Sequence, residues 1–297
     1  MQRIAALLAA LTPGAAAAQA SAAAGLWRVA ATTLVTPEAL ATGGASSLWS
    51  PAQFAPPGRA SLSLEIVQTP NAVSAAGLLA TARLRVRPIG ELGLVYGSMQ
   101  VADLVRTTVD PTPVDGGIPY GTRKLGLNWT LTTGGTTLGA TVGWEHTRLD
   151  EARSDRATCD VGVRQALPAG IWLSVASHLS PLTTDQPQHE FYGGVEWGIW
   201  HGTSWTGSGQ MTLSLRYGAT LATGLAPDHQ FGLGLALADV LALDVKVVRE
   251  EDYGLVGWRG SAGVRIGIGP YRVRYARDTG MNDLGSAYRV GLEALLP

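Results

Sequence analysis

The sequence predicts an all-β protein, a transmembrane antiparallel up-and-down β-barrel of about 14 strands whose lumen holds an N-terminal plug. Charged residues make up only 15% of the 297 residues, whereas soluble domains carry about 25%. From residue 60 onward, apolar and polar side chains alternate with a period of two, which is typical of strands with two unlike faces. The connections between these strands are alternately short and long, as in membrane barrels.

The charge and cysteine content exclude several classes of protein. The formal net charge is −1 and Cys159 is the only cysteine. A near-neutral chain offers no basic field for a nucleic-acid backbone. One cysteine permits neither an intrachain disulfide nor a cysteine-rich metal site. We therefore expect no nucleic-acid partner, no metal site and no cofactor.

Residues 1–20 have the features of a secretory signal peptide. Arg3 gives the positive start, Ile4–Leu11 form a short apolar run, and Ala18-Gln19-Ala20 fit a cleavage site. An uncleaved anchor is the alternative, but the apolar run is shorter than the roughly 20 residues that a spanning helix needs. The rest of the chain is then expected in the outer membrane of a Gram-negative bacterium, in contact with its lipids.

Residues 21–58 differ from the rest and are predicted to form the plug. Leu26–Val35 fit a short strand and Thr36–Leu40 a helical turn, after which glycines and prolines prevent any long element. Leu48, Trp49 and Phe54 need shelter from water, and the barrel lumen offers it. An unstructured periplasmic leader is the alternative.

Residues 59–297 are predicted to form the barrel. Gln210–Leu221 show the pattern most clearly, with Leu213, Leu215 and Tyr217 on one face and Ser214, Arg216 and Gly218 on the other. Strands are predicted at 60–67, 77–87, 91–105, 122–132, 136–148, 157–167, 171–180, 189–200, 209–221, 229–238, 240–249, 254–268, 270–277 and 287–296.

Loop lengths and aromatic residues distinguish a membrane barrel from a soluble sandwich. Tight turns alternate with longer polar links, such as 106–121 and 278–286, with 201–208 as an exception. On the apolar face, aromatic residues fall at strand ends, where membrane barrels have two girdles, whereas a sandwich core would spread them. The loop-side set is Trp144, Phe191, Tyr217, Phe231, Trp258, Tyr275 and Tyr288, and the turn-side set is Trp129, Trp197 and Tyr271.

The charged residues share the opposite face and are predicted to line the lumen, because a basic side chain facing lipid costs about 2–4 kcal/mol at the bilayer midplane. Closure of the barrel should bring the charges of the first and last strands into one sector. We expect a charge ladder of Glu65, Arg272, Arg289 and Glu293, and a ligand site of Trp49, Phe54, Arg83, Arg85 and Arg274. A ladder of mutual ion pairs that only fills the barrel is the alternative.

The run Ala45–Phe54 (ASSLWSPAQF), followed by an alternating strand, resembles the N-terminal hatch of FadL-type outer-membrane proteins and their PorV/PorQ-like relatives. Ser50-Pro51-Ala52 stands where that superfamily has Asn-Pro-Ala. The stretch 271–292 is similar to the closing hairpin of the PorV-like branch. The resemblance implies a 14-stranded plugged barrel, with an inward kink in the third strand of FadL-type transporters. Gly93 and Gly97 in the predicted third strand fit such a kink.

Two functions follow from this resemblance. The barrel passes or binds small, mainly hydrophobic compounds, with arginines attracting an anionic headgroup. Alternatively, it is a PorV-like secretion-associated barrel whose loops 106–121 and 278–286 bind protein partners. Ser174, His178 and Asp160 share the lumen face, but no nucleophile-elbow motif is present, so we expect no enzyme.

Overall fold

The computed structural model describes residues 22–53, 58–70, 73–102, 104–107, 113–180, 188–203, 209–222, 225–252, 255–280 and 285–296. The predicted signal peptide and Phe54 therefore lie outside the described residues. Among the described residues, no helix is long and apolar enough to cross a membrane.

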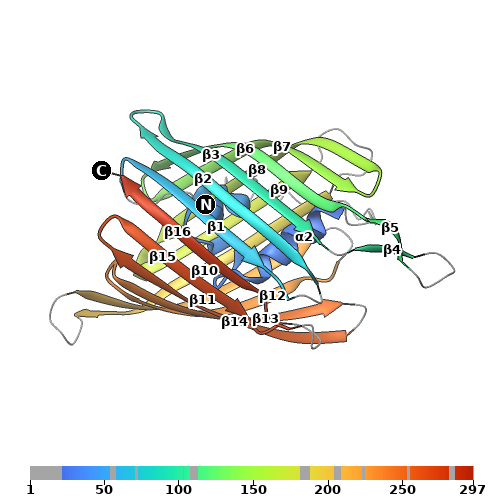
Figure 1. Ribbon diagram of the computed structural model, residues 1–297. Coiled ribbons are helices and arrows are strands. Elements are labelled where there is room, and N and C mark those ends of the chain that lie inside the picture. The colour runs from blue at the N-terminus through green and yellow to red at the C-terminus, as the bar shows by residue number, and fades with distance from the viewer. Residues whose placement is uncertain are drawn as a thin grey trace.

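The fold is a closed antiparallel barrel of 14 strands, which confirms the predicted class (Figure 1). The barrel strands are β1 (Ala60–Gln68), β2 (Ala75–Val86), β3 (Gly90–Val101), β6 (Tyr120–Thr133), β7 (Thr136–Leu149), β8 (Ala152–Leu167), β9 (Ile171–Ser180), β10 (Gln188–Thr203), β11 (Gln210–Ala222), β12 (Asp228–Leu237), β13 (Leu241–Asp252), β14 (Leu255–Ile268), β15 (Tyr271–Asp278) and β16 (Tyr288–Leu296). Each pairs with its neighbour in the chain, and β1 closes the ring on β16, from Ala60↔Leu296 to Gln68↔Tyr288.

The connections follow the predicted alternation. Residues 87–89, 134–135, 168–170, 238–240 and 269–270 make short turns at one end of the barrel, with the short helix η4 (Pro168–Gly170) among them. This end, which also holds the start of β1 and the end of β16, is called the turn side below, and the opposite end the loop side. The predicted link 106–121 contains an unpredicted hairpin, β4 (Val105–Thr107) paired with β5 (Pro113–Gly117), which projects from the loop side (Figure 1).

The wall has an apolar outer face and a polar inner face. Burial alternates residue by residue, as in β1, where Ser61, Ser63 and Glu65 are buried and Leu62, Leu64 and Ile66 are about half exposed. The outward aromatic residues include Trp258 and Trp144 at 63% and 55% exposure near the loop side, and Tyr271 and Trp197 at 54% and 48% near the turn side. An exposed apolar band of this extent is typical of a surface that lipid covers.

One barrel strand departs from strict alternation. The pairing of β10 with β11 shifts register between Gly198 and Trp200, so Ile199 is an inserted residue. Ile199 and Trp200 are both exposed, at 38% and 43%. A bulge of this kind changes which face the following side chains occupy. The inward-facing positions of β10 therefore have even numbers up to Gly198 and odd numbers from His201 onward.

The N-terminal segment 22–53 lies within the barrel (Figure 1). It consists of α2 (Ala22–Thr32) and the short helices η1 (Glu38–Leu40), η2 (Gly44–Leu48) and η3 (Pro51–Gln53). The predicted strand at Leu26–Val35 is wrong. Leu26, Ala30 and Ala31 are buried at helical spacing, and α2 makes its contacts with β2, β3, β6 and β7 as a helix, because the apolar stripe that meets the wall outweighs the strand propensity of the sequence.

Glycines in the wall allow this segment to approach closely. A Cβ on Gly97 would lie 2.6 Å from the ring of Trp27, and one on Gly139 only 2.4 Å from the carbonyl carbon of Pro51. Strand β3 pairs with both neighbours without a register shift. Gly97 therefore accommodates the segment, and the described β3 does not break its pairing as a lateral opening would require.

Candidate functional site

Most inward-facing charges of the described wall are joined in ion pairs. Opposite charges lie at similar heights on nearby strands. Where β1 meets β16, closure of the barrel also forms an ion pair between residues far apart in the chain, Glu65 and Arg289. The pairs that bear on the predicted site join Arg83 and Arg85 to Glu91, Lys124 to Asp160, Arg216 to Glu196 and Asp244, Arg272 to Asp239, Arg274 to Glu293, and Arg289 to Glu65.

Four of the predicted residues meet at the seam between β1, β15 and β16. The Arg289 guanidinium donates to Glu65 at 2.9 Å, and Arg274 donates to Glu293 at 2.8 Å and lies 3.8 Å from Glu65. All except Arg274 are buried. Because each arginine contacts a carboxylate, this network neutralises its own charge.

The same network holds the N-terminal segment. Arg289 donates to the Ala30 carbonyl at 2.7 Å and to the Thr33 hydroxyl at 3.0 Å, and Arg274 donates to the Thr42 carbonyl at 2.8 Å. The Arg289 guanidinium also lies 5.1 Å from the ring centre of Trp49, within range of a cation–π interaction.

The remaining predicted arginines lie outside this network. Arg83, with a fully buried side chain, and Arg85, with 40% of its side chain exposed, share Glu91 at 2.5 Å and 2.6 Å. Arg272 pairs with Asp239, whose side chain is 81% exposed. The structure thus brings together Glu65, Arg274, Arg289 and Glu293 with Trp49 nearby, whereas Arg83 and Arg85 pair elsewhere. Arg272 lies opposite Glu293 in register, but its guanidinium pairs with Asp239.

Asp160 and His178 lie opposite each other on β8 and β9, whereas Ser174 lies four residues further along β9, and His178 and Ser174 both hold the N-terminal segment. Asp160 lies between Lys124 and His178, at 2.6 Å and 2.9 Å. The other ring nitrogen of His178 lies 2.9 Å from the Trp49 carbonyl oxygen. A carbonyl can only accept, so this nitrogen carries a proton and is not a free base. Ser174 accepts from the Gln53 amide at 3.4 Å. The arrangement is that of a clamp rather than of a nucleophile and its base.

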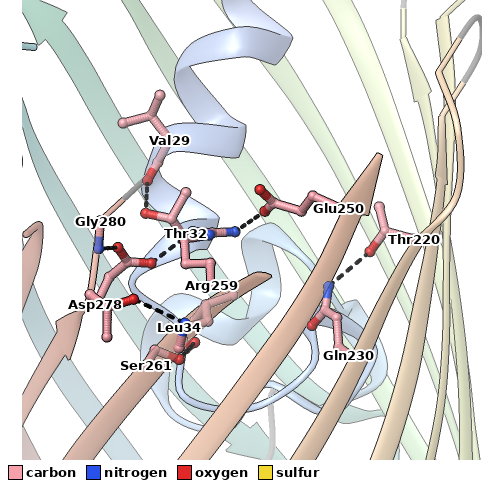
Figure 2. Close-up of polar contacts among 12 residues, drawn as sticks. Val29, Thr32, Leu34, Thr220, Gln230, Glu250, Arg259, Ser261, Asp278 and Gly280 are labelled. Atoms are coloured by element: carbon pink, nitrogen blue, oxygen red, sulfur yellow. Dashed lines mark hydrogen bonds and ion pairs between the residues drawn. The ribbon is translucent and has the colours of Figure 1, made fainter. Parts of the chain in front are cut away.

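A further polar cluster lies on the loop side, where β11 to β15 meet residues 29–34 of the N-terminal segment (Figure 2). Arg259 bridges Glu250 and Asp278, the latter at 2.9 Å. Ser261 donates to the Leu34 carbonyl at 3.1 Å, and Gln230 contacts Glu38 and Thr220. These contacts attach the N-terminal segment to this half of the wall.

A cavity of about 390 Å³ remains between residues 33–42 and the inner face of strands β9 to β16 and β1. We call it the lumen cavity. It is lined by apolar side chains from the segment and the wall and by charged side chains toward the turn side. The inward-facing lining residues include Leu34, Val35, Trp172, Glu196, Arg216, Ala236, Ala242, Asp244, Arg265 and Arg274.

The lumen cavity differs from the predicted ligand site. Arg274 lines it, whereas Trp49, Arg83 and Arg85 do not belong to its lining. The sequence alternation placed Arg216, Asp244 and Arg265 on the lumen face, but it did not mark them as site residues. Their proximity depends on strand register, which becomes visible only in pairs such as Arg265↔Arg274 and Glu196↔Arg216.

The part of the chain that the structure describes contains no group of three or more histidine, cysteine, aspartate or glutamate residues that could hold a metal ion. Cys159 is a free thiol, partly exposed on the outward-facing side of β8.

No protein-family model matches the sequence, and a comparison with curated proteins finds none that matches. Solved structures of similar fold include porins. A porin variant from Rh. blastica has a TM-score of 0.41 at 8% identity, covering 79% of this chain and 98% of its own. The KdgM porin gives 0.39 at 6% identity (79% and 98% covered). Salmonella typhi OmpF in complex with daunomycin gives 0.39 at 9% identity (79% and 96% covered). At these values the functions of those porins do not transfer to this chain.

Proposed function

We propose that the protein is an outer-membrane β-barrel, plugged by its N-terminal segment, whose lumen cavity binds small, mainly hydrophobic molecules on their way across the membrane. The observation that carries this proposal is the lumen cavity, which lies between residues 33–42 and the inner face of strands β9 to β16 and β1. Its volume of about 390 Å³ falls in the range of small-molecule sites.

The two faces of the wall support a location in the membrane. A bilayer core cannot hydrogen-bond a strand edge, so a sheet that crosses it must close on itself, and this sheet is closed. Leu127, Trp258 and Ile268 on the outer face are each more than 60% exposed. Such side chains lower the free energy when lipid replaces water around them.

The contacts of the N-terminal segment support its role as a plug. Strands on opposite sides of the ring hold it: β7 through Glu145 and Trp27 (2.6 Å), β9 through His178 and Trp49 (2.9 Å), and β16 through Arg289 and Ala30 (2.7 Å). A segment fixed at several points around the wall narrows the lumen to the spaces beside it.

The lining of the lumen cavity supports a ligand with an apolar body. Leu34 and Val35 come from the plug, and Ala236, Ala242 and Trp172 come from the wall. The guanidinium of Arg164 lies 4.2 Å from the ring centre of Trp172, which leaves the ring in a fixed orientation beside the cavity.

Uptake into liposomes tests this function. Vesicles reconstituted with the protein should take up a fatty acid faster than empty vesicles. Ala236→Phe, which places a ring in the lumen cavity, should slow uptake, whereas Ala262→Phe, on the outward face of β14, should not. Equal rates with and without the protein would contradict the proposed function.

A PorV-like role in protein secretion is the second candidate. The many contacts between plug and wall favour it. If they keep the lumen closed, the barrel would act through its loops and not through passage of a solute. The links 106–121 and 278–286 would then bind protein partners. Crosslinking in cells that recovers no envelope protein through these loops would contradict this candidate.

A further inference from the structure

We propose that Arg265 is the subsite for the anionic group of the ligand, so that the lumen cavity selects amphipathic carboxylates or similar oxyanions over neutral and cationic compounds. This inference rests on the proposed function, since it requires that the cavity bind a ligand. It moves the headgroup site away from the arginines that the sequence suggested.

The neighbours of Arg265 leave its guanidinium without a counter-charge. In register, Arg265 lies opposite Ala242 on β13 and opposite Arg274 on β15. Along its own strand, the adjacent inward positions are Gly263 and Gly267. A cation therefore faces a second cation across the sheet, and the other directly opposite and same-strand positions carry no side chain larger than a methyl group.

The nearest acids are engaged by other arginines. Asp244 on β13 pairs with Arg216, and Asp239, in the turn before β13, pairs with Arg272 at 3.2 Å. Within the described residues, no hydrogen bond or ion pair joins the Arg265 side chain to the protein. Like charges directly opposite each other destabilise a sheet, and a partly buried cation is costly without a partner. An anion from solution would relieve both effects.

The chemistry of the guanidinium indicates the ligand class. Its planar fork donates two parallel hydrogen bonds to a carboxylate or a related oxyanion. Leu34, Val35 and Ala242 line the same cavity and can cover an apolar body attached to that group. The inferred ligand is a monoanion with an aliphatic or aromatic body small enough for about 390 Å³.

Fluorine NMR of two matched probes with the full-length protein in detergent tests this inference. The probes are para-trifluoromethylbenzoate and the neutral para-trifluoromethylbenzyl alcohol, which share one apolar body. We expect the benzoate to bind more tightly to the wild type by about tenfold, the scale of a hydrogen bond to a charged group. Arg265→Gln should remove this preference while leaving the affinity for the alcohol unchanged.

The control is Arg59→Gln. Arg59 is an exposed arginine at the turn side, immediately before β1, so this variant makes the same charge change outside the lumen cavity and should keep the preference for benzoate. If both probes bind equally and Arg265→Gln changes neither, the anionic subsite is refuted and the proposed binding function stands. If neither probe binds, the proposed function fails and the subsite fails with it.

Discussion

Replacing Gly139 by alanine should release the N-terminal segment 22–53 from the wall without breaking the barrel. Gly139 lies on the inner face of β7, where η3 passes over it. An added Cβ would lie 2.4 Å from the carbonyl carbon of Pro51 and 2.5 Å from the backbone nitrogen of Ala52. These are backbone atoms, so no side-chain rotation can relieve the overlap.

The cost follows from the size of the overlap. Carbon atoms pack best at about 3.5 Å, so η3 must move by roughly 1 Å or leave its position. The shift would also strain the 3.3 Å hydrogen bond that Thr130 donates to Pro51. Overpacking of this kind costs about 1–3 kcal/mol, which raises the population of molecules with the N-terminal segment undocked by about 5- to 150-fold.

Cysteine labelling measures this population. Ser50 is fully buried next to η3, so Ser50→Cys in a Cys159→Ala background should react with a polar maleimide only when the N-terminal segment leaves the wall. Gly139→Ala should accelerate labelling by the factor above. Gly193→Ala on β10 is the matched control, because nothing lies within 4 Å of a Cβ there. Equal labelling rates in the two alanine variants, with the barrel intact, would refute the reasoning.

Two further substitutions test the wall. Leu215→Arg should lower the free energy of unfolding of the barrel in vesicles by about 2–4 kcal/mol in urea titrations, because Leu215 is 44% exposed on the outer face of β11. Leu225→Arg, beyond the end of β11, should have little effect. An equal cost for both variants would argue against a lipid-facing wall. Arg83→Met should lower the free energy of unfolding by about 3 kcal/mol, since it leaves the buried Glu91 carboxylate with fewer partners. Combining Arg83→Met with Glu91→Leu should recover most of that loss. A double variant as unstable as the single one would contradict the importance of the pair.

The barrel was predictable because its signal is local. Each strand carries the period-two pattern within its own residues, and strand ends coincide with turn residues such as Gly134 and Gly135. The bulge at Ile199 was not predictable, since an inserted residue in an apolar run of Trp197, Ile199 and Trp200 leaves no mark in the sequence.

The N-terminal segment and the lumen cavity were harder to predict, because both depend on contacts between distant residues. The stretch from Leu26 to Val35 resembles a strand locally, and only the surrounding wall makes α2 favourable. Arg83 and Arg265 look alike in the alternation pattern. Register places Glu91 opposite Arg85 and within ion-pair distance of Arg83, and it places a second arginine opposite Arg265. Their different surroundings therefore emerge only from the assembled sheet.

The central claim, that the apolar side of each strand faces lipid and the polar side faces an enclosed lumen, is tested most directly by spin labels placed one at a time along Gln210–Leu221 of β11 in reconstituted vesicles. Collisions with membrane-dissolved oxygen should peak at Leu213, Leu215 and Tyr217 and fall at the intervening positions. A profile without this alternation, or with high oxygen collision rates at Ser214 and Arg216 instead, would contradict it.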